Sequence, residues 1–439
     1  MIDDSILENY VSKIPTITLD RKLKMSPIQT IYGGAHLFSS SSIQKLGHIA
    51  KTTFAENLSN HEQLRHFIKG ITATEKLSLL SNQSIFQTEE KFFKILYDRV
   101  INKLNSSAVE DLRIDFEDGF GIRSDEEEDM ECSRAAAELI LMIKSNTMPQ
   151  KIGIRIKSLT SNPRRSLKTL YLFLSTVLNM AVLPQNFVVT IPKIRSPREI
   201  EVLDEFLSMI ENKFGLENKI PIELLVELPE SIVNNNGEFI LPQFIKASNN
   251  RCQSIHIGVY DYTSAMDVSA ESQTLFHPVG EFQRLLTQLL LKQLDVALVD
   301  GATNILPIAK YKNATLDSKE FTINRSIILS SWRVSFTDIT ESLRRGIYRG
   351  WDLHPNQLPI RYVAVFYFFL INLDSTLKRL NQFMNSNERA TRTDVIFDDA
   401  ATVRGLINHI LLGFNCGAIS QSDLDHYQIN LNIIKNLII

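Results

Sequence analysis

Acidic side chains recur where short apolar segments of this 439-residue sequence end. Asp115, Glu117 and Asp118 end one such segment, Glu227 ends a second, and Asp261 ends a third. Carboxylates that face one another repel unless a cation holds them. Oxygen ligands from one or two carboxylates, completed by water and substrate, suit Mg²⁺. The pattern predicts a Mg²⁺ site, and Glu227 and Asp261 are its candidate ligands, because an unpartnered charge beside an apolar segment is costly.

Two basic residues belong to further segments of the same kind, Arg155 within one and Lys193 at the end of another. A divalent cation at the carboxylates would chelate a small oxyacid and act on it as a Lewis acid. Arg155 would then neutralise a substrate carboxylate or a developing enolate. We assign Arg155, Lys193 and Asp300, which ends another segment, to substrate binding.

Three further residues are candidates for catalytic roles. Glu117 and Asp118 would fix metal-bound water or orient the arginine. His36 follows the glycines of the first segment and is a candidate proton carrier, because histidine titrates near neutral pH. Structural roles stay open: His36 fits a turn, and Asp115 and Asp300 fit helix caps or turns.

The elements that position these residues are eight short segments, many of them rich in valine and isoleucine, which alternate with helical stretches. They span residues 28–38, 111–120, 151–159, 187–194, 222–230, 254–265, 295–304 and 346–355. Strands that alternate with helices imply a parallel sheet, and such apolar strands are typical of burial on both faces. Eight units predict a (β/α)8 TIM barrel, whose catalytic groups lie at the carboxyl ends of the strands.

An open doubly wound sheet is the alternative arrangement of these units. It usually carries a glycine-rich phosphate loop after its first strand, and neither GxGxxG nor GxxxxGK occurs here. We therefore place one barrel domain at residues 28–385, with a helical insertion at 40–110 between its first two strands. Residues 1–27 are then an N-terminal extension and residues 386–439 a C-terminal helical extension.

Composition narrows the class of protein. The chain has 47 Lys and Arg against 50 Asp and Glu, a balance that argues against a nucleic-acid-wrapping protein. The first residues are acidic rather than basic-then-apolar, so they do not predict a secretory signal. The most apolar stretch, 362–373, is shorter than the ~20 residues of a membrane span and predicts a buried helix. Three distant cysteines favour neither a disulfide framework nor a zinc site. We expect a cytoplasmic protein that binds neither membrane nor nucleic acid.

Six longer motifs follow the order of the predicted strands. They are IDFEDGFGIR (114–123), IGIRIKSL (152–159), VTIPKI (189–194), LLVELPESI (224–232), HIGVYDYTSA (256–265) and GWDLHPNQ (350–357). Together they resemble the citrate lyase β-subunit-like and HpcH/HpaI aldolase family of the phosphoenolpyruvate/pyruvate barrel superfamily. The resemblance places Arg155 on the active-site arginine of that family, and Glu227 and Asp261 on its two metal ligands.

The resemblance implies a carbon–carbon lyase or aldolase that depends on Mg²⁺ or Mn²⁺. Its substrate would be a 2-oxo acid such as pyruvate, glyoxylate or oxaloacetate, or an acyl-CoA derived from one, cleaved through a metal-stabilised enolate. Asp261 lies in Tyr-Asp-Tyr, which is similar to malate synthase, so condensation of glyoxylate with acetyl-CoA is an alternative. A non-catalytic ligand-binding barrel is another. Barrels of this family usually assemble, so we also expect a homo-oligomer.

Overall fold

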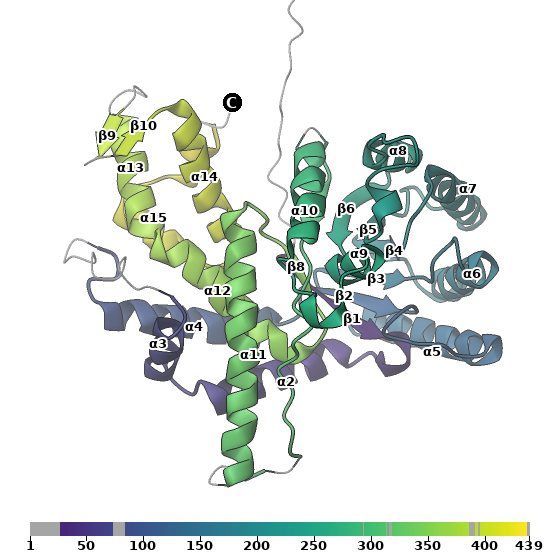
Figure 1. The fold of residues 1–439 in the computed structure, drawn as a ribbon, viewed down its shortest axis with the longest axis horizontal. Helices are drawn as coiled ribbons and strands as arrows, with labels where there is room; N and C mark the ends of the chain where they lie inside the picture. The colour runs from purple at the N-terminus through teal and green to yellow at the C-terminus, as the bar shows by residue number, and fades with distance from the viewer. Residues whose placement is uncertain are drawn as a thin grey trace, which may run out of the picture.

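A computed structural model describes residues 27–72, 84–292, 294–312, 314–315, 318–385, 391–393 and 396–436. Within these residues, eight parallel strands form a nearly closed barrel that helices surround (Figure 1). The (β/α)8 prediction is therefore confirmed. The expected N-terminal extension, residues 1–27, lies outside the described residues except for its last one.

The strands coincide with the eight predicted segments but are shorter. They are β1 (Gln29–Gly34), β2 (Asp111–Asp115), β3 (Lys151–Arg155), β4 (Phe187–Ile191), β5 (Ile222–Val226), β6 (Cys252–Ile257), β7 (Ala297–Val299) and β8 (Gly350–Asp352). Each strand pairs in parallel with the next as far as β7, and β8 pairs with β1. A bridge between Asp300 and Gly350 joins β7 to β8, so all the strand ends that carry candidate residues meet at one mouth.

Helices cover the outside of the barrel. Those that follow β2 to β7 are α5 (Asp125–Lys144), α6 (Pro163–Met180), α7 (Pro197–Phe214), α8 (Leu241–Ala247), α9 (Val259–Ala265), α10 (Pro278–Leu291) and α11 (Lys319–Arg344). Local sequence fixes where they begin. Ser124 and Glu127 form the capping box that opens α5, and Ser196 with Glu199 does the same for α7.

A second group of helices lies to one side of the barrel (Figure 1). Between β1 and β2 the chain forms α2 (Ser42–Asn57), α3 (His61–Lys69) and α4 (Glu89–Ser107), and after β8 it forms α12 (Leu358–Ile371), α13 (Leu373–Asn385), α14 (Ala400–Asn415), α15 (Gln421–His426) and α16 (Leu431–Asn436). α12 packs against both α4 and α11, and α14 packs against α13. The segments before β2 and after β8 therefore share one packed layer.

Three local predictions differ from the structure. The segment predicted as a strand over 254–265 ends at Ile257, where its pairing with both β5 and β7 has ended, and α9 follows. The long helix predicted over 359–385 is interrupted at Asn372. Two antiparallel strands, β9 (Thr391–Thr393) and β10 (Ile396–Asp398), occur in the C-terminal part, where only helices were expected.

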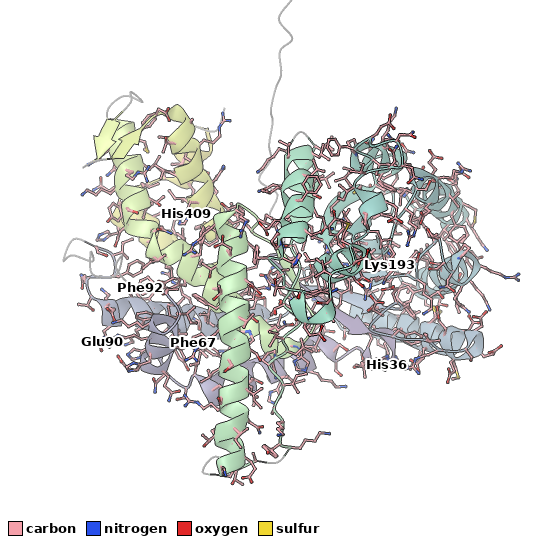
Figure 2. All side chains as sticks on the ribbon, viewed as in Figure 1. His36, Phe67, Glu90, Phe92, Lys193 and His409 are labelled. Atoms are coloured by element: carbon pink, nitrogen blue, oxygen red, sulfur yellow. The ribbon has the colours of Figure 1, made fainter. Side chains whose placement is uncertain are left out.

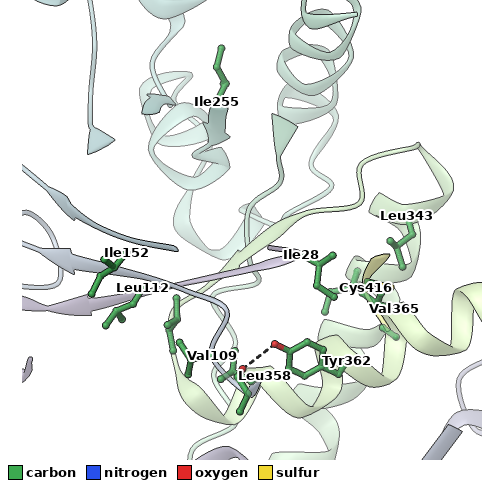
Figure 3. Close-up of a cluster of buried hydrophobic side chains, with 14 of the residues drawn as sticks. Ile28, Val109, Leu112, Ile152, Ile255, Leu343, Leu358, Tyr362, Val365 and Cys416 are labelled. Atoms are coloured by element: carbon green, nitrogen blue, oxygen red, sulfur yellow. Dashed lines mark hydrogen bonds between the residues drawn. The ribbon is translucent and has the colours of Figure 1, made fainter. Parts of the chain in front are cut away.

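The apolar core continues from the barrel into the side helices. Ile28 and Val109, at the amino ends of the first two strands, lie near Leu358 and Tyr362 of α12 (Figure 3). The Tyr362 hydroxyl donates a hydrogen bond to the carbonyl of Ala108 at 3.0 Å. Among the described helices, Pro355–Asn385 is the one stretch long and apolar enough to cross a membrane, yet 72% of its window is buried inside the molecule. Such burial is typical of a core helix, as predicted for 362–373.

Candidate functional site

Arg155 and Asp115 end the neighbouring strands β3 and β2, where they are paired in register. Both are buried, and the guanidinium donates to both carboxylate oxygens, from Nε to Oδ1 at 2.6 Å and from Nη2 to Oδ2 at 2.5 Å. Asp115 also accepts hydrogen bonds from the amides of Glu117 and Gly119, so it shapes the turn after β2 as well. This two-point contact fixes the plane of the arginine and leaves Nη1 directed toward further acidic groups.

Those acidic groups are Glu117 and Asp118. Nη1 of Arg155 lies 3.3 Å from Glu117 Oε2 and 3.8 Å from Asp118 Oδ2. The Lys193 ammonium approaches the same pair from the end of β4, 2.5 Å from Glu117 Oε1 and 3.1 Å from Asp118 Oδ2. Burial raises the pKa of Glu117 despite its two cationic neighbours. The structure thus brings Arg155, Glu117, Asp118 and Lys193 together at one mouth of the barrel.

Glu227 lies directly after β5 and is 2% exposed. Its Oε1 accepts a hydrogen bond from the backbone amide of Lys193 at 2.7 Å. Lys193 presents that amide from a left-handed conformation, with φ of 52°, which is uncommon outside glycine and typical of functional sites. Gly258 packs against the glutamate, where an added Cβ would lie 2.5 Å from Glu227 Cβ. Backbone and side-chain contacts therefore hold this carboxylate in place.

Asp261 completes the group from the first turn of α9. Its side chain is 42% exposed, and Oδ1 lies 3.9 Å from the Lys193 ammonium. Burial and the charge of Asp261 raise the pKa of Glu227 to about 8. The carboxylate thus has a high proton affinity that a divalent cation would offset, and these residues fit Mg²⁺.

A second group of possible metal ligands occurs elsewhere in the described residues. His61, Glu62 and Glu90 have ligand atoms within 4.8 Å of one another. They are half-buried to exposed, and Figure 2 labels Glu90 on the side of the molecule away from Lys193. Side chains of this kind commonly cluster on protein surfaces without an ion, and no further observation points to a ligand there.

His36 and Asp300 are not brought into contact with this group. His36 lies in the 3₁₀ turn after β1, its ring centre 5.8 Å from that of Phe120, and burial lowers its pKa. Asp300 is buried after β7, where its carboxylate accepts hydrogen bonds from Arg284 of α10 and Ser342 of α11. Its partners are outer helices, as its alternative structural role would require. The proton-carrier and substrate-binding roles assigned to these two residues remain predictions without a supporting contact.

Sequence reasoning missed a layer of charge inside the barrel. The fully buried Arg113 of β2 forms ion pairs with Asp111 and with Glu223 of β5. Lys151 reaches the same glutamate at 2.6 Å. A signal was present, because Asp111, Arg113 and Asp115 alternate with apolar residues, and period two places alternating residues on one face of a strand. That face points into the barrel.

Comparisons with known proteins agree with the fold. A family model described as Domain of unknown function (DUF6986) matches residues 18–437. No curated protein sequence matches the chain. Among solved structures, a citrate lyase from Burkholderia xenovorans has a TM-score of 0.51 at 16% identity, covering 76% of this chain and 93% of that one. This similarity confirms the fold that the sequence motifs indicate.

Two further solved structures are more distant. CitE from Mycobacterium tuberculosis, in complex with magnesium, acetoacetate and coenzyme A, has a TM-score of 0.45 at 14% identity, covering 74% of this chain and 95% of that one. A malate synthase from Haloferax volcanii has a TM-score of 0.47 at 13% identity, covering 95% of this chain and 99% of that one.

Proposed function

The chain belongs to the family described as Domain of unknown function (DUF6986), and for this member we propose a Mg²⁺-dependent carbon–carbon lyase or aldolase activity on a 2-oxo acid or an acyl-CoA derived from one. The main support for this proposal is that the buried Glu227 carboxylate lies with Asp261 and Arg155 at the carboxyl ends of the barrel strands. The charges of Glu227 and Asp261 repel each other, and a divalent cation bound between them would offset that repulsion.

Glu227 and Asp261 would hold the ion. When bound, Mg²⁺ supplies Lewis-acid polarisation of a chelated oxo acid. Arg155 binds the carboxylate of the substrate or neutralises the enolate that carbon–carbon cleavage leaves, because its guanidinium is already oriented by Asp115. Lys193 holds Glu227 through its amide and Glu117 through its ammonium, so it orients the acidic groups around that position. The cation at Lys193 also keeps the mouth from accumulating uncompensated negative charge.

Titration calorimetry with Mg²⁺ and pyruvate, oxaloacetate or glyoxylate tests this proposal. We expect a 2-oxo acid to bind only with Mg²⁺ present, and Glu227→Gln and Asp261→Asn each to abolish that binding and the associated turnover while the fold is retained. Glu201→Gln changes an exposed glutamate on α7 and is the matched control. Binding of wild-type strength in both site variants, or no Mg²⁺-dependent binding by the wild type, would overturn the assignment.

The same substrates distinguish a condensing enzyme from a lyase. Acetyl-CoA with glyoxylate and Mg²⁺ would release free thiol if the chain were a condensing enzyme, whereas a lyase would form a 2-oxo acid from a longer substrate. Size-exclusion chromatography with light scattering tests the proposed homo-oligomer.

A further inference from the structure

The charged layer inside the barrel converges on Glu223. Its two oxygens accept hydrogen bonds from Arg113, Lys151, Thr190 and Ser254, and the glutamate is fully buried. Burial acts to raise the pKa of Glu223, but the neighbouring charges of Arg113 and Lys151 hold it well below the usual range. The carboxylate therefore stays ionised. A fixed negative charge therefore lies in the barrel interior.

A histidine and a tyrosine connect this carboxylate to Arg155 of the candidate site. His256 of β6 is 1% exposed, and its Nε2 lies 3.5 Å from Glu223 Oε2. The other ring nitrogen, Nδ1, is hydrogen-bonded to the hydroxyl of Tyr32 at 3.0 Å. A carboxylate beside Nε2 favours the proton on that nitrogen, which leaves Nδ1 to accept from the tyrosine. Burial lowers the pKa of His256, so the ring is neutral and able to accept a proton.

The tyrosine in turn contacts the candidate active site. The guanidinium carbon of Arg155 lies 4.9 Å from the centre of the Tyr32 ring, and Trp351 packs edge-on against the same ring. Tyr32 is 7% exposed, and its ring lies against Arg155 while its hydroxyl is bonded to His256. The proposed reaction requires a group that exchanges a proton with carbon, and His36, the group assigned that role from sequence, has no contact with the site residues.

From this geometry we infer that Tyr32 is the proton donor and acceptor of the site, and that His256 and Glu223 position and relay its proton. The inference rests on the proposed function and deepens it. The arrangement places a hydroxyl, an imidazole and a carboxylate in series, which is the order that activates the nucleophile in a Ser-His-Asp triad. Here the activated hydroxyl would serve as an acid and base.

When a methyl carbon beside the oxo group is deprotonated, its C–H bond breaks, the electron pair enters the enolate, and the proton passes to the Tyr32 oxygen. The original Tyr32 proton passes at the same time to Nδ1 of His256. The products are an enolate beside Arg155 and an imidazolium beside the Glu223 carboxylate. Protonation of the enolate after cleavage runs through the same transfers in reverse.

Exchange of the methyl protons of pyruvate for deuterium in D₂O with Mg²⁺, followed by proton NMR, tests the role of Tyr32. The Tyr32→Phe variant removes only the hydroxyl and keeps the ring against Arg155. We expect it to lower the exchange rate by about 100-fold or more, the scale of a lost general acid–base, while Mg²⁺-dependent pyruvate binding stays within twofold of wild type. Tyr362→Phe removes another buried hydroxyl, away from the site, and should leave the exchange rate unchanged.

The outcomes distinguish the inference from the proposed function. Exchange by Tyr32→Phe at the wild-type rate overturns the inference and leaves the proposed function standing. If the wild type binds pyruvate in a Mg²⁺-dependent way but exchanges no protons, the inference is likewise overturned and the proposed function stands. Absence of Mg²⁺-dependent binding in the wild type overturns the proposed function itself.

A second measurement does not depend on activity. Nitrogen-15 NMR of histidine-labelled protein reports which ring nitrogen of His256 carries the proton, with His256→Gln identifying the signal. We expect Nε2 to be protonated and Nδ1 to accept a hydrogen bond, and Tyr32→Phe to shift the Nδ1 resonance toward that of a free acceptor. A proton on Nδ1, or no shift in the variant, would overturn the relay.

Discussion

At the scale of single residues, the candidate site depends on how the side chains of Arg155 and Lys193 and the neighbouring carboxylates orient one another. Asp115 contributes two oxygens to Arg155, and Lys193 contributes a backbone amide to Glu227 and an ammonium to Glu117. Each contact fixes a direction as well as balancing a charge. The orientation of the guanidinium should therefore matter as much as its charge.

Arg155→Lys tests this dependence on geometry. Lysine retains the charge but cannot make two parallel hydrogen bonds to Asp115 while a third nitrogen faces Glu117. We expect Mg²⁺-dependent binding of a 2-oxo acid to weaken by about 10- to 100-fold, roughly 1.4–2.7 kcal/mol, in titration calorimetry. Arg165→Lys, at a buried arginine of α6 that pairs with Glu128, should leave this binding unchanged. Equal affinity of Arg155→Lys and wild type would show that charge alone is sufficient.

At the scale of the elements, α11 carries an acidic residue with an unfavourable environment. Asp338 is largely buried and lies close to Asp300. Its burial and, to a lesser degree, the charge of Asp300 raise the pKa of Asp338 to about 7, and the charge of Arg284 on α10 offsets only part of this increase. One turn earlier on the same helix, the buried hydroxyl of Ser335 has no hydrogen-bond partner among the described residues. This stretch of helix therefore lowers the stability of the fold at neutral pH.

The expected pH dependence follows from that raised pKa. An unfolded aspartate releases its proton near pH 4, whereas Asp338 in the folded chain keeps its proton until about pH 7. The contribution of this group to the free energy of unfolding therefore decreases as the pH rises from about 4 to about 7. Asp338→Asn should raise the free energy of unfolding at pH 8 by about 1–3 kcal/mol and change it little at pH 4, because partial exposure reduces the full effect. Urea unfolding at both pH values measures this. The exposed Thr337→Asn is the control, and an equal effect at both pH values would contradict the assignment.

The elements also show how far the sequence predicted the site. Alternation of strands and helices predicted all eight strands, and parallel strands place their carboxyl ends at one edge, so the meeting of Arg155, Lys193 and Glu227 followed. The face that a strand-end residue takes depends on its partners in space. Asp300 therefore turned toward Arg284, which no local pattern indicated.

Other features were missed for related reasons. Apolar strands were interpreted as buried on two apolar faces, so the charged interior around Glu223 was not expected. Its charges balance only when strands distant in sequence are brought together. The change from strand to helix at Val259 likewise coincides with the end of pairing to β5 and β7, which the sequence of β6 alone does not show.

At the scale of the whole molecule, the barrel and the helices beside it share one large cluster of buried apolar residues. Leu207 of α7, on the barrel, and Ile407 of α14, in the C-terminal part, both belong to it and are both fully buried. The Arg99 guanidinium of α4 also pairs with Asp423 of α15 at 2.8 Å, which links the part before β2 to the part after β8. The described helices after residue 385 therefore pack into the same core as the rest of the chain.

A shared core predicts that the C-terminal helices and the barrel unfold together. Leu207→Ala and Ile407→Ala each remove a buried side chain and should each cost about 2–5 kcal/mol, according to the cavity left behind. Both should move one common unfolding transition, followed by far-ultraviolet circular dichroism and by tryptophan fluorescence from Trp332 and Trp351, which lie outside both mutated helices. If Ile407→Ala created an earlier transition in circular dichroism and left the tryptophan signal in place, the C-terminal helices would be an independent unit. Coincident shifts would instead mean that the helices after residue 385 stabilise the barrel that carries Glu227 and Arg155.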